Sequence, residues 1–520
     1  MARDMQTAVI PEHTTVLIVG GGPTGLVMSS LLSGYGINNT VIERQPVQPV
    51  DPRAHVVRKR PMEILSGLGL LDEINSAKPS LPMKYITWCS TLAGEEAGKI
   101  DLLRGAEEII EGYPWTNIPQ NYLQPILYNK AVSEPTAQVL MGANVTSAQE
   151  SGDRIDVHVS LESDGSQHLV TTDWLVVADG AGSRTRDCLG IPMEGRGPGG
   201  TFFMVHFKAN IAEWVDPRPG PLYWILNPEA PGTIIAHDPE KFGVYMTPEF
   251  GLENEEDGLI ARFHQAVGKS VPTEVVSIRK WVAHGQIARA YRKGRAFLVG
   301  DAAHRFPPTG GLGLNTGLLE ANNLAWKLAY VIRGLAEDAL LDTYEPECKP
   351  AAVANTKTSL DNQARLREIA DALGSFESPG QLEERIREIK QSGDCSLDDA
   401  IENQRSHFTF DGTLPGSVWA GDHFSAYALS NACNGFCLYV DDEQAVADLN
   451  DTLSSLCRIN VMVCPMPQLT DRDERLTWLT SQKAVLCRPD GIIEWSSDQD
   501  LSGQVELVAE RISQMLSGKY

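Results

Sequence analysis

The chain has 520 residues, about three to four times the usual size of one domain, so we expect two or three domains. Hydrophobic residues make up 42% and charged residues 22% of the sequence, which supplies a large core and excludes a disordered or fibrous protein. Lys and Arg number 44 against 68 Asp and Glu, a net charge of −24, which argues against a surface that binds nucleic acid or anionic membranes.

A strand-turn-helix-strand unit opens the chain. Residues 15–19 are apolar and mostly β-branched, which predicts a buried parallel strand. Residues 26–35 have the composition of a helix, and residues 40–42 predict a second strand. Together they predict a βαβ unit.

Glycines fill the first turn of this unit. Gly20, Gly22 and Gly25 match the G-x-G-x-x-G pattern, in which the backbone approaches a pyrophosphate at a helix N-terminus. Glu43 follows Gly25 by 18 residues and ends the second strand, where a carboxylate can accept hydrogen bonds from a ribose. The alternative is a glycine-rich turn that binds nothing.

A second strand-rich part follows. Residues 154–161 and 169–178 predict a hairpin, because Asp164 and Gly165 form a turn signal between them. Residues 201–250 alternate apolar and polar residues with many Pro and Gly, which predicts an inserted antiparallel sheet.

Two further signals surround this sheet. Asp179-Gly180 with Ser183 and Arg186 ends one strand, and Gly300-Asp301 ends another at residues 295–299. A loop with four glycines and a helix at residues 318–333 follow Asp301. This order would place a carboxylate on a ribityl chain and backbone amides near an isoalloxazine ring. A plain NAD dehydrogenase needs no such second segment.

The last third of the chain predicts helices and a small α/β domain. Residues 361–399 are charged and helical, and a Gly and Pro cluster at residues 414–421 is typical of a linker. Strands are predicted at residues 436–440, 460–464, 484–488 and 492–495.

The nine cysteines are scattered and odd in number, which indicates reduced thiols in a cytoplasmic protein. Cys433 and Cys437 lack the second ligand pair of a zinc site, and their spacing is one residue too long for a redox Cys-x-x-Cys motif. We expect no bound metal, signal peptide or membrane helix.

The three glycine and aspartate motifs, in this order, resemble those of the FAD-dependent aromatic hydroxylases. These are single-component flavoprotein monooxygenases with the p-hydroxybenzoate hydroxylase fold, and the tail of this chain is similar to the phenol hydroxylase and 3-(3-hydroxyphenyl)propionate hydroxylase branch. The resemblance implies an α/β protein with a Rossmann-like FAD-binding domain, an inserted and mostly antiparallel substrate-binding sheet, and a C-terminal thioredoxin-like domain. The boundaries it implies are 12–190 and 280–350 for the FAD-binding domain, 80–120 and 191–279 for the sheet, 351–415 for a helical connector, and 421–520 for the thioredoxin-like domain.

The resemblance also assigns cofactor contacts. The first glycines form the pyrophosphate turn, Glu43 binds the ribose, Gln120 lies beside the ribityl chain, and Asp179 serves both FAD and the nicotinamide nucleotide. Leu312 and Glu320 depart from the family pattern, and neither change threatens FAD binding. The full predicted set is Gly20, Gly22, Pro23, Thr24, Gly25, Glu43, Arg44, Arg53, Gln120, Asp179, Asp301, Pro308, Gly311, Gly313, Leu314 and Asn315.

The implied reaction is hydroxylation of a phenolic or related aromatic substrate with O2 and NAD(P)H, NADPH being favoured, through a flavin C4a-hydroperoxide. Open alternatives are a noncatalytic flavin-binding protein and other oxygenase outcomes: halogenation, epoxidation, dearomatisation or decarboxylative hydroxylation. Halogenation is disfavoured because a flavin-dependent halogenase would be expected to contain a Trp-x-Trp-x-Ile-Pro segment, and no two of the ten tryptophans here are two residues apart. The expected partners are small molecules, and homodimer formation stays open.

A phenol becomes a better nucleophile as the phenolate, so the reaction needs a base near its hydroxyl. His55 is the first candidate, because it follows Arg53 by two residues where relatives carry an ionisable residue that faces the substrate. The alternative is that His55 only satisfies backbone groups in its turn. Tyr223, His206 and Tyr245 on the predicted sheet are further candidates, each with a core or surface role as the alternative. His304 is predicted to support the flavin loop.

Overall fold

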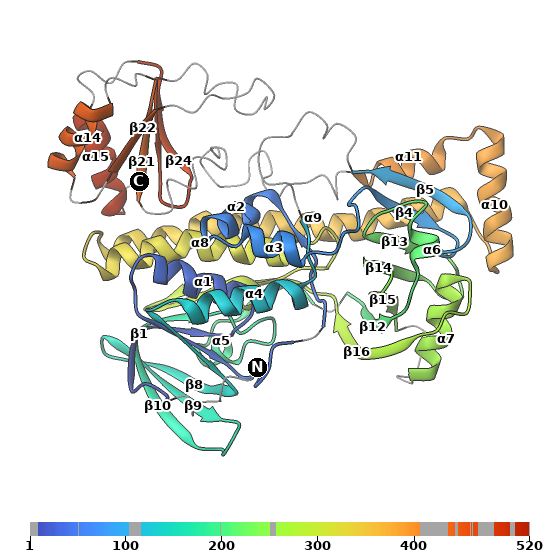
Figure 1. Ribbon diagram of the computed structural model, residues 1–520, viewed down its shortest axis with the longest axis horizontal. Helices are drawn as coiled ribbons and strands as arrows, with labels where there is room; N and C mark the ends of the chain where they lie inside the picture. Colours follow the sequence, from blue (N-terminus) through green and yellow to red (C-terminus); the bar gives the residue numbers. More distant parts are fainter. Residues whose placement is uncertain are drawn as a thin grey trace.

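The structure is a computed structural model. It describes residues 9–49, 51–102, 116–197, 199–249, 256–405, 435–441, 446–457, 459, 461–465, 483–499 and 505–518. Three larger sheets, of eight, seven and four strands, organise these residues. The long helices α8 (Leu312–Ile332) and α9 (Tyr344–Leu373) run through the middle of the molecule, with the seven-stranded and four-stranded sheets toward opposite ends (Figure 1).

The eight-stranded sheet is the predicted βαβ sheet and its extension. Its strand order is β18-β19-β10-β1-β2-β7, and β9 and β8 continue from the first half of β10 as an antiparallel meander. β1 pairs in parallel with both β2 and β10, and Val16, Leu17 and Ile18 at its centre are fully buried. The strands are β1 His13–Val19, β2 Asn39–Glu43, β7 Ala137–Met141, β8 Ala143–Ser151, β9 Arg154–Leu161, β10 Gln167–Val177, β18 Arg292–Lys293 and β19 Ala296–Leu298.

Helices α1 and α8 pack closely against each other beside this sheet. Gly317 makes the approach possible, because a Cβ at this position would lie 2.5 Å from the Thr24 hydroxyl and 3.1 Å from the Gly300 backbone. α8 begins at Leu312, earlier than the helix predicted from residue 318, and its first turns contain Gly313 and Gly317, residues of low helix propensity. The other helices of this part are α1 Pro23–Gly34, α2 Lys59–Gly67, α3 Leu71–Ala77, α4 Gln120–Ser133 and α5 Arg184–Cys188.

Short strands and turns join this part to the rest of the chain. They are β3 Val56–Val57 paired with β6 Thr116–Asn117, the sheet of β11 Met193–Arg196, β17 Gly285–Ala288 and β20 His304–Arg305, and the 3-10 helices η1 Gly300–Ala302 and η2 Asp338–Thr343.

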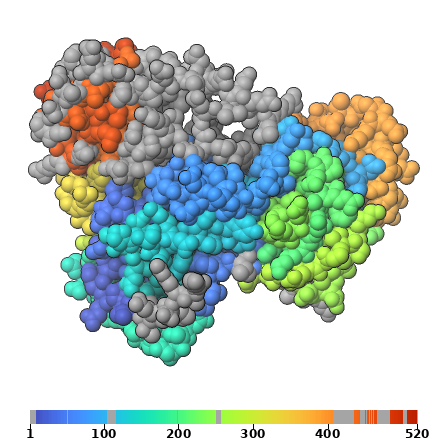
Figure 2. Space-filling view, in the orientation of Figure 1, coloured from blue at the N-terminus to red at the C-terminus, as the bar shows by residue number. Residues whose placement is uncertain are grey.

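The seven-stranded sheet has the order β16-β12-β15-β14-β13-β4-β5, and every neighbouring pair is antiparallel except β13 with β4. Phe263 of α7 (Glu256–Val267) packs against Phe207 and Tyr245, so this helix covers one face. α10 (Pro379–Ser392) and α11 (Ser396–Glu402) pack at the β4 and β5 end (Figure 2). The remaining elements are β4 Tyr85–Cys89, β5 Glu96–Asp101, β12 Thr201–Lys208, α6 Ala212–Val215, β13 Leu222–Ile225, β14 Gly232–Asp238, β15 Phe242–Pro248 and β16 Glu274–Val282.

The C-terminal sheet has the order β22-β21-β23-β24 and contains the four predicted strands. Trp326 and Tyr330 of α8 pack edge-on against Phe436 of β21, with ring centroids 5.9 and 6.1 Å apart. The predicted linker at residues 414–421 and Cys433 lie outside the described residues. The elements are β21 Phe436–Val440, α14 Val446–Leu456, β22 Val461–Pro465, β23 Ala484–Cys487, β24 Ile493–Ser497 and α15 Val505–Leu516.

Buried ion pairs connect this C-terminal sheet to α8 and α9. Arg488 contacts Asp490 at 2.5 Å and Glu347 at 2.8 Å, and Lys327 lies 2.9 Å from Glu347. Burial raises the pKa of Glu347, but Lys327 and Arg488 outweigh it and hold that pKa well below its usual value. Ion pairs as well as aromatic contacts thus join the C-terminal sheet to α8.

Arg488→Ala should destabilise the protein by roughly 3–5 kcal/mol, because it leaves the Asp490 carboxylate buried without the cation that contacts it. Urea unfolding measures the change. Lys483→Ala, directly before β23, is the matched control, since the Lys483–Asp441 pair is half exposed and should contribute about 1 kcal/mol or less. Equal stabilities for the two variants would contradict the predicted role of the buried pairs.

Candidate active site

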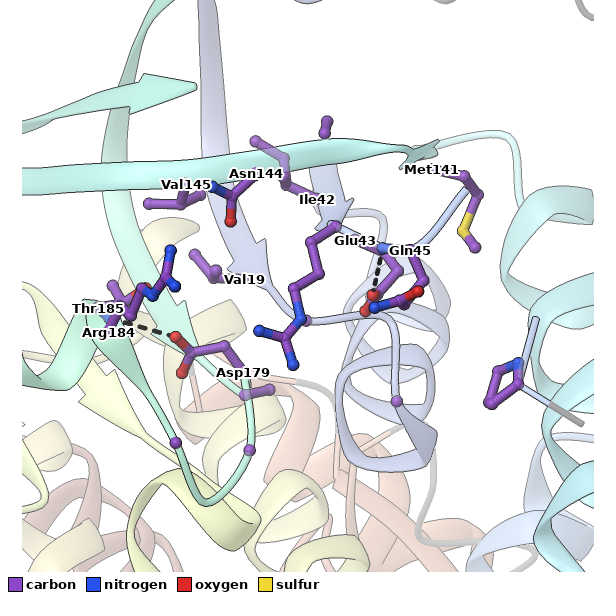
Figure 3. Close-up of a pocket in the computed structure, with 18 of the residues that line it drawn as sticks. Val19, Ile42, Glu43, Gln45, Met141, Asn144, Val145, Asp179, Arg184 and Thr185 are labelled. Atoms are coloured by element: carbon purple, nitrogen blue, oxygen red, sulfur yellow. Dashed lines mark hydrogen bonds between the residues drawn. The ribbon is translucent and has the colours of Figure 1, made fainter. Parts of the chain in front are cut away.

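A groove lies at the carboxyl ends of β1, β2 and β10 (Figure 3). Ligands of parallel α/β sheets bind at this edge. Seven of the sixteen predicted cofactor residues line it: Gly20, Gly22, Glu43, Arg44, Arg53, Gln120 and Asp179.

The three motif glycines are required for two different reasons. A Cβ on Gly20 would lie 2.3 Å from the Ala178 carbonyl oxygen, and one on Gly25 would lie 2.0 Å from the Gly20 carbonyl oxygen. Gly22 is different, because a Cβ there would have no protein atom within 4 Å and would project into open space. Since Gly22 precedes the first turn of α1, whose N–H groups lack helical partners, the open space suits a pyrophosphate.

Glu43 is fixed at the rim of the groove. Its carboxylate accepts hydrogen bonds from the backbone N–H of Gly21 at 2.7 Å and of Gln45 at 2.8 Å; Figure 3 shows the second. The carboxylate is therefore held at the end of β2, where the sequence predicts a ribose contact.

Asp179 faces Thr185 across the turn after β10 (Figure 3). One carboxylate oxygen accepts a hydrogen bond from the Thr185 N–H at 3.2 Å, and the other is buried without a partner among the described residues. An unsatisfied buried oxygen of this kind indicates a polar ligand or water in the groove.

Asp301, in the second motif, lies beside the first turn of α8. A Cβ on Gly313, in the first turn of α8, would be 3.6 Å from an Asp301 carboxylate oxygen. Asp301 is exposed at the protein surface. The protein atoms around its carboxylate nevertheless reduce the hydration of the charged form and raise the pKa of Asp301, and the nearby His304 and Arg53 oppose this rise. The segment that contains Arg53 and the segment that contains His304 and Gly313 thus meet at the Asp301 carboxylate.

The other predicted cofactor residues have different positions. Thr24 packs beneath Gly300 and Gly317, and Gly25 contacts Gly20, so both support the turn from behind. Pro23 is buried at the start of α1. Around the start of α8, Pro308 and Gly311 are exposed, and Gly313 and Leu314 are half-buried.

Asn315 fastens the segment after His55 to α8. Its amide oxygen accepts a hydrogen bond from the Arg58 N–H at 2.8 Å, and its amide nitrogen donates to the Val56 carbonyl at 2.9 Å. Val56 also lies nearest to Gly311, whose Cβ would be 3.9 Å from that of Val56. His55 therefore directly precedes the backbone that borders the N-terminus of α8.

His304 and Glu320 form a buried pair below the second motif. Glu320 accepts hydrogen bonds from the Gly300 N–H at 2.7 Å and from His304 at 3.1 Å, and His304 stacks on Phe306 at 4.4 Å. Burial lowers the pKa of His304, but the Glu320 carboxylate outweighs it and holds the pKa above its usual value. These contacts support a structural role for His304 and explain why Glu320 is tolerated as a departure from the family pattern.

Tyr223 and Tyr245 lie on the face of the seven-stranded sheet that α7 covers. The hydroxyl of Tyr223 donates to the Arg218 carbonyl at 2.8 Å, and that of Tyr245 donates to the Ala230 carbonyl at 3.0 Å. Burial raises the pKa of Tyr245 to about 12 and that of Tyr223 still further. Both side chains are core residues with satisfied hydroxyls, which does not support the predicted catalytic role.

His55 and His206 lie near a third histidine that sequence reasoning missed, His237. The ring centroids of His55 and His237 are 5.1 Å apart, and Phe242 lies 5.7 Å from His237 and 5.8 Å from His206. Ile234 and Ala236 pack toward α7, whereas His237 contacts His55 and Phe242 and so lies on the opposite face of the sheet. Because the pairing of β14 with β15 is irregular between Ala236 and Asp238, alternation along the sequence could not have assigned this face.

The groove also contains residues that the sequence did not indicate. Gln124 follows Gln120 by one helical turn, accepts its hydrogen bond at 2.9 Å and donates to the Gly21 carbonyl at 3.1 Å, so helical spacing could have found it. Asn144 and Arg184 also line the groove, and no motif marks either one.

A family profile described as "FAD binding domain" matches residues 13–359. The chain belongs to the family of FAD-dependent aromatic hydroxylases. The open space at Gly22 and the unpartnered Asp179 oxygen fit FAD, which is the cofactor of this monooxygenase family.

Relatives extend the match along the chain. The 2,4-dichlorophenol 6-monooxygenase of Cupriavidus pinatubonensis is 33% identical over 73% of this chain and 67% of its own length. The tetracenomycin A2 monooxygenase-dioxygenase of Streptomyces glaucescens is 31% identical over 98% of each chain. The structure of the flavin-dependent monooxygenase PieE with FAD and substrate matches 97% of this chain and 99% of its own, with a TM-score of 0.85 and 24% identity, and so shares the fold. Among the described residues, no helix is long and apolar enough to cross a membrane.

Asp301→Ala should weaken FAD binding by roughly 1–3 kcal/mol, because it removes a carboxylate that can accept hydrogen bonds from the ribityl chain. Titration of the FAD-free protein with FAD, followed by flavin fluorescence, measures the affinity. Asp153→Ala is the control, since this carboxylate is 86% exposed on the outer meander. Undiminished FAD affinity in Asp301→Ala would remove Asp301 from the cofactor site.

Proposed function

We propose that this protein hydroxylates a phenolic or related aromatic substrate with O2 and NAD(P)H, with NADPH favoured as the reductant. The observation that carries the proposal is the position of His55, next to the Val56 backbone that Asn315 fastens to the N-terminus of α8. The ionisable side chain of His55 thus lies where residues 56–58 and the N-terminus of α8 meet the seven-stranded sheet, at His237 of β14. The relatives named as acting on 2,4-dichlorophenol and phenol support a phenolic substrate.

When bound, FAD supplies the oxygen chemistry: it takes electrons from the nicotinamide and activates O2. The chain supplies the binding. Gly22 would leave space for the pyrophosphate, Glu43 would accept hydrogen bonds from the ribose, and Asp179 and Asp301 would bind the remaining polar groups. Arg53, which is close enough to Asp301 to lower its pKa, joins the groove to the His55 segment.

His55 is proposed as the base that takes the phenolic proton. Its Nδ1 lies 3.0 Å from the Asn117 amide oxygen, an acceptor, so with the amide in this orientation Nδ1 carries the proton and Nε2 keeps the lone pair. Burial lowers the pKa of His55, and Asn117 opposes this in part. The neutral imidazole is therefore the prevailing form at neutral pH, as a general base requires.

The test is a panel of phenols with the purified holoenzyme, following oxidation of NADPH and of NADH and the mass of the product. The panel should include polycyclic phenols, because relatives named as polyketide hydroxylases match 66% of the chain. Addition of one oxygen atom to a phenol, with faster nicotinamide oxidation in its presence, is the expected result. Bound FAD without oxygenation of any member would support the noncatalytic alternative.

The remaining parts of the chain have proposed roles as well. The seven-stranded sheet, from residues 80–120 and 191–279, is proposed to bind the substrate on the face away from α7. Residues 421–520 are proposed to form a thioredoxin-like domain after the 351–415 connector, and residues 12–190 and 280–350 to form the FAD-binding domain. The order β22-β21-β23-β24, with β21 and β22 parallel and the other pairs antiparallel, supports this. We propose a structural role for this domain in a cytoplasmic enzyme, with homodimer formation left to measurement of mass in solution.

A further inference from the structure

His237 is buried with unused hydrogen-bonding capacity. Its side chain is 0% exposed, and neither ring nitrogen has a hydrogen-bond partner among the described residues. A neutral imidazole has one donor and one acceptor, and leaving either of them buried and unpaired is costly. A native core seldom retains two such groups on one ring without a ligand or water that satisfies them.

The surroundings of His237 are aromatic and contain two more imidazoles. His55 meets it edge to face at 76°, with centroids 5.1 Å apart, and the Phe242 ring is tilted against it with centroids 5.7 Å apart. His206 contacts Phe242 in turn, and its Nδ1 is also buried without a partner among the described residues. We call His55, His206 and His237 the histidine cluster.

The histidine cluster is not a metal site. In the part of the chain that the structure describes, no group of three or more His, Cys, Asp or Glu side chains is placed to hold a metal ion. The unpaired nitrogens therefore indicate a neutral or organic ligand.

The charge state of His237 follows from its position. Burial lowers its pKa well below the usual value, and His55 and His206 lower it further because a second positive charge nearby is unfavourable. Asp51 raises the pKa of His206, but burial outweighs it, and the Asp51 carboxylate is already bonded to Ser277 and Arg279. His237 thus presents one N–H and one lone pair at neutral pH.

Resting on the proposed function, we propose that His237 is a substrate-binding residue that hydrogen-bonds the phenolic oxygen from which His55 takes the proton. A hydrogen-bonded nitrogen lies about 2.8 Å from its oxygen. Two rings whose centroids are 5.1 Å apart can therefore both reach one hydroxyl, which donates to His55 and accepts from His237. Phe242 supplies an apolar contact for the aromatic ring beside it.

This arrangement predicts selectivity for rings that bear a hydroxyl, because other rings leave buried histidine nitrogens without a hydrogen-bond partner. A ring without the hydroxyl leaves the buried nitrogens of His237 without a partner, and sites of this kind reject such analogues strongly. The ligand class is accordingly a ring that bears a free hydroxyl, rather than any aromatic hydrocarbon of the right size.

The experiment compares 2,4-dichlorophenol with 1,3-dichlorobenzene, which lacks only the hydroxyl. Binding to the holoenzyme is measured from the change in flavin absorbance. The wild-type protein should prefer the phenol, and His237→Phe should reduce that preference by about 10- to 100-fold while FAD stays bound. The melting temperature should be unchanged or higher, because phenylalanine removes two unpaired polar groups. His237→Gln should keep part of the preference.

Tyr245→Phe is the matched control, because its hydroxyl lies on the opposite face of the same sheet and should not affect the preference. If the enzyme oxygenates phenols and His237→Phe keeps the full preference, the inference is overturned and the proposed function stands. If His237→Phe fails to fold, an unchanged preference in His237→Gln and in His237→Asn overturns it equally. A wild-type enzyme that oxygenates no phenol overturns the proposed function, and the inference with it.

Discussion

Gly22→Val should give a folded protein that contains no FAD. A Cβ at position 22 meets no protein atom within 4 Å, so the valine side chain projects into the groove without straining the fold. The same side chain would occupy the space in which the pyrophosphate has to approach the backbone of α1. Flavin content after purification should fall from about one per chain to near zero, while the far-UV circular dichroism spectrum stays that of the wild type.

The matched control is Gly25→Ala, in the same turn. Its Cβ would lie 2.0 Å from the Gly20 carbonyl oxygen, so the alanine has to displace backbone of the turn itself. We expect loss of stability together with loss of FAD. Full flavin content in Gly22→Val would mean that the pyrophosphate lies elsewhere, and unfolding of Gly22→Val would mean that the open space is structural.

The contrast between these glycines separates what the sequence could predict, the turn itself, from what it could not, the surroundings of each glycine. The pattern of Gly20, Gly22 and Gly25 between a β-branched run and a helix is local, so strand, turn and helix follow from neighbouring residues. The same holds for Glu43 at the end of β2. Which glycine faces the ligand and which faces the protein depends on β10 and Ala178, more than 150 residues away, and this could not be predicted from the turn.

For the catalytic candidates, the sequence could not predict which face of the sheet each side chain occupies. Tyr223 and Tyr245 were correctly expected on a sheet, but the face that a side chain occupies depends on what covers the sheet. Here α7, which follows these strands in the chain, buries Tyr245 and leaves His237 on the opposite face. A register irregularity between Ala236 and Asp238 also interrupts simple alternation in β14.

The attachment of the C-terminal sheet could not be predicted for a similar reason. Arg488 and Glu347 are 141 residues apart, and neither belongs to a motif. An ion pair of this kind depends on how two parts of the chain that are distant in sequence pack together, and no local pattern contains that information.

His55→Ala should bind FAD and accept electrons from the nicotinamide as before, yet hydroxylate about 10² to 10⁴ times more slowly. The variant lacks the base that converts the phenol to the more nucleophilic phenolate. It should therefore release more hydrogen peroxide per nicotinamide oxidised. Product yield and peroxide, measured in the same reaction, give this coupling ratio. Asn117→Ala is a second variant, which keeps His55 but removes the partner of Nδ1, and it should lose less activity.

The pH dependence separates a base from a structural residue. In the wild type, burial lowers the pKa of His55, so its neutral form persists below the usual histidine range and hydroxylation falls only as pH drops through that lowered pKa. His55→Ala should lose this acidic limb and instead gain activity as pH rises toward the phenol pKa of about 10, where the substrate ionises by itself. Addition of imidazole should recover part of the rate if the cavity left by the side chain admits it. Wild-type coupling with an unchanged pH profile would exclude His55 as the base and leave His237 and His206, the other members of the histidine cluster, as the residues to substitute next.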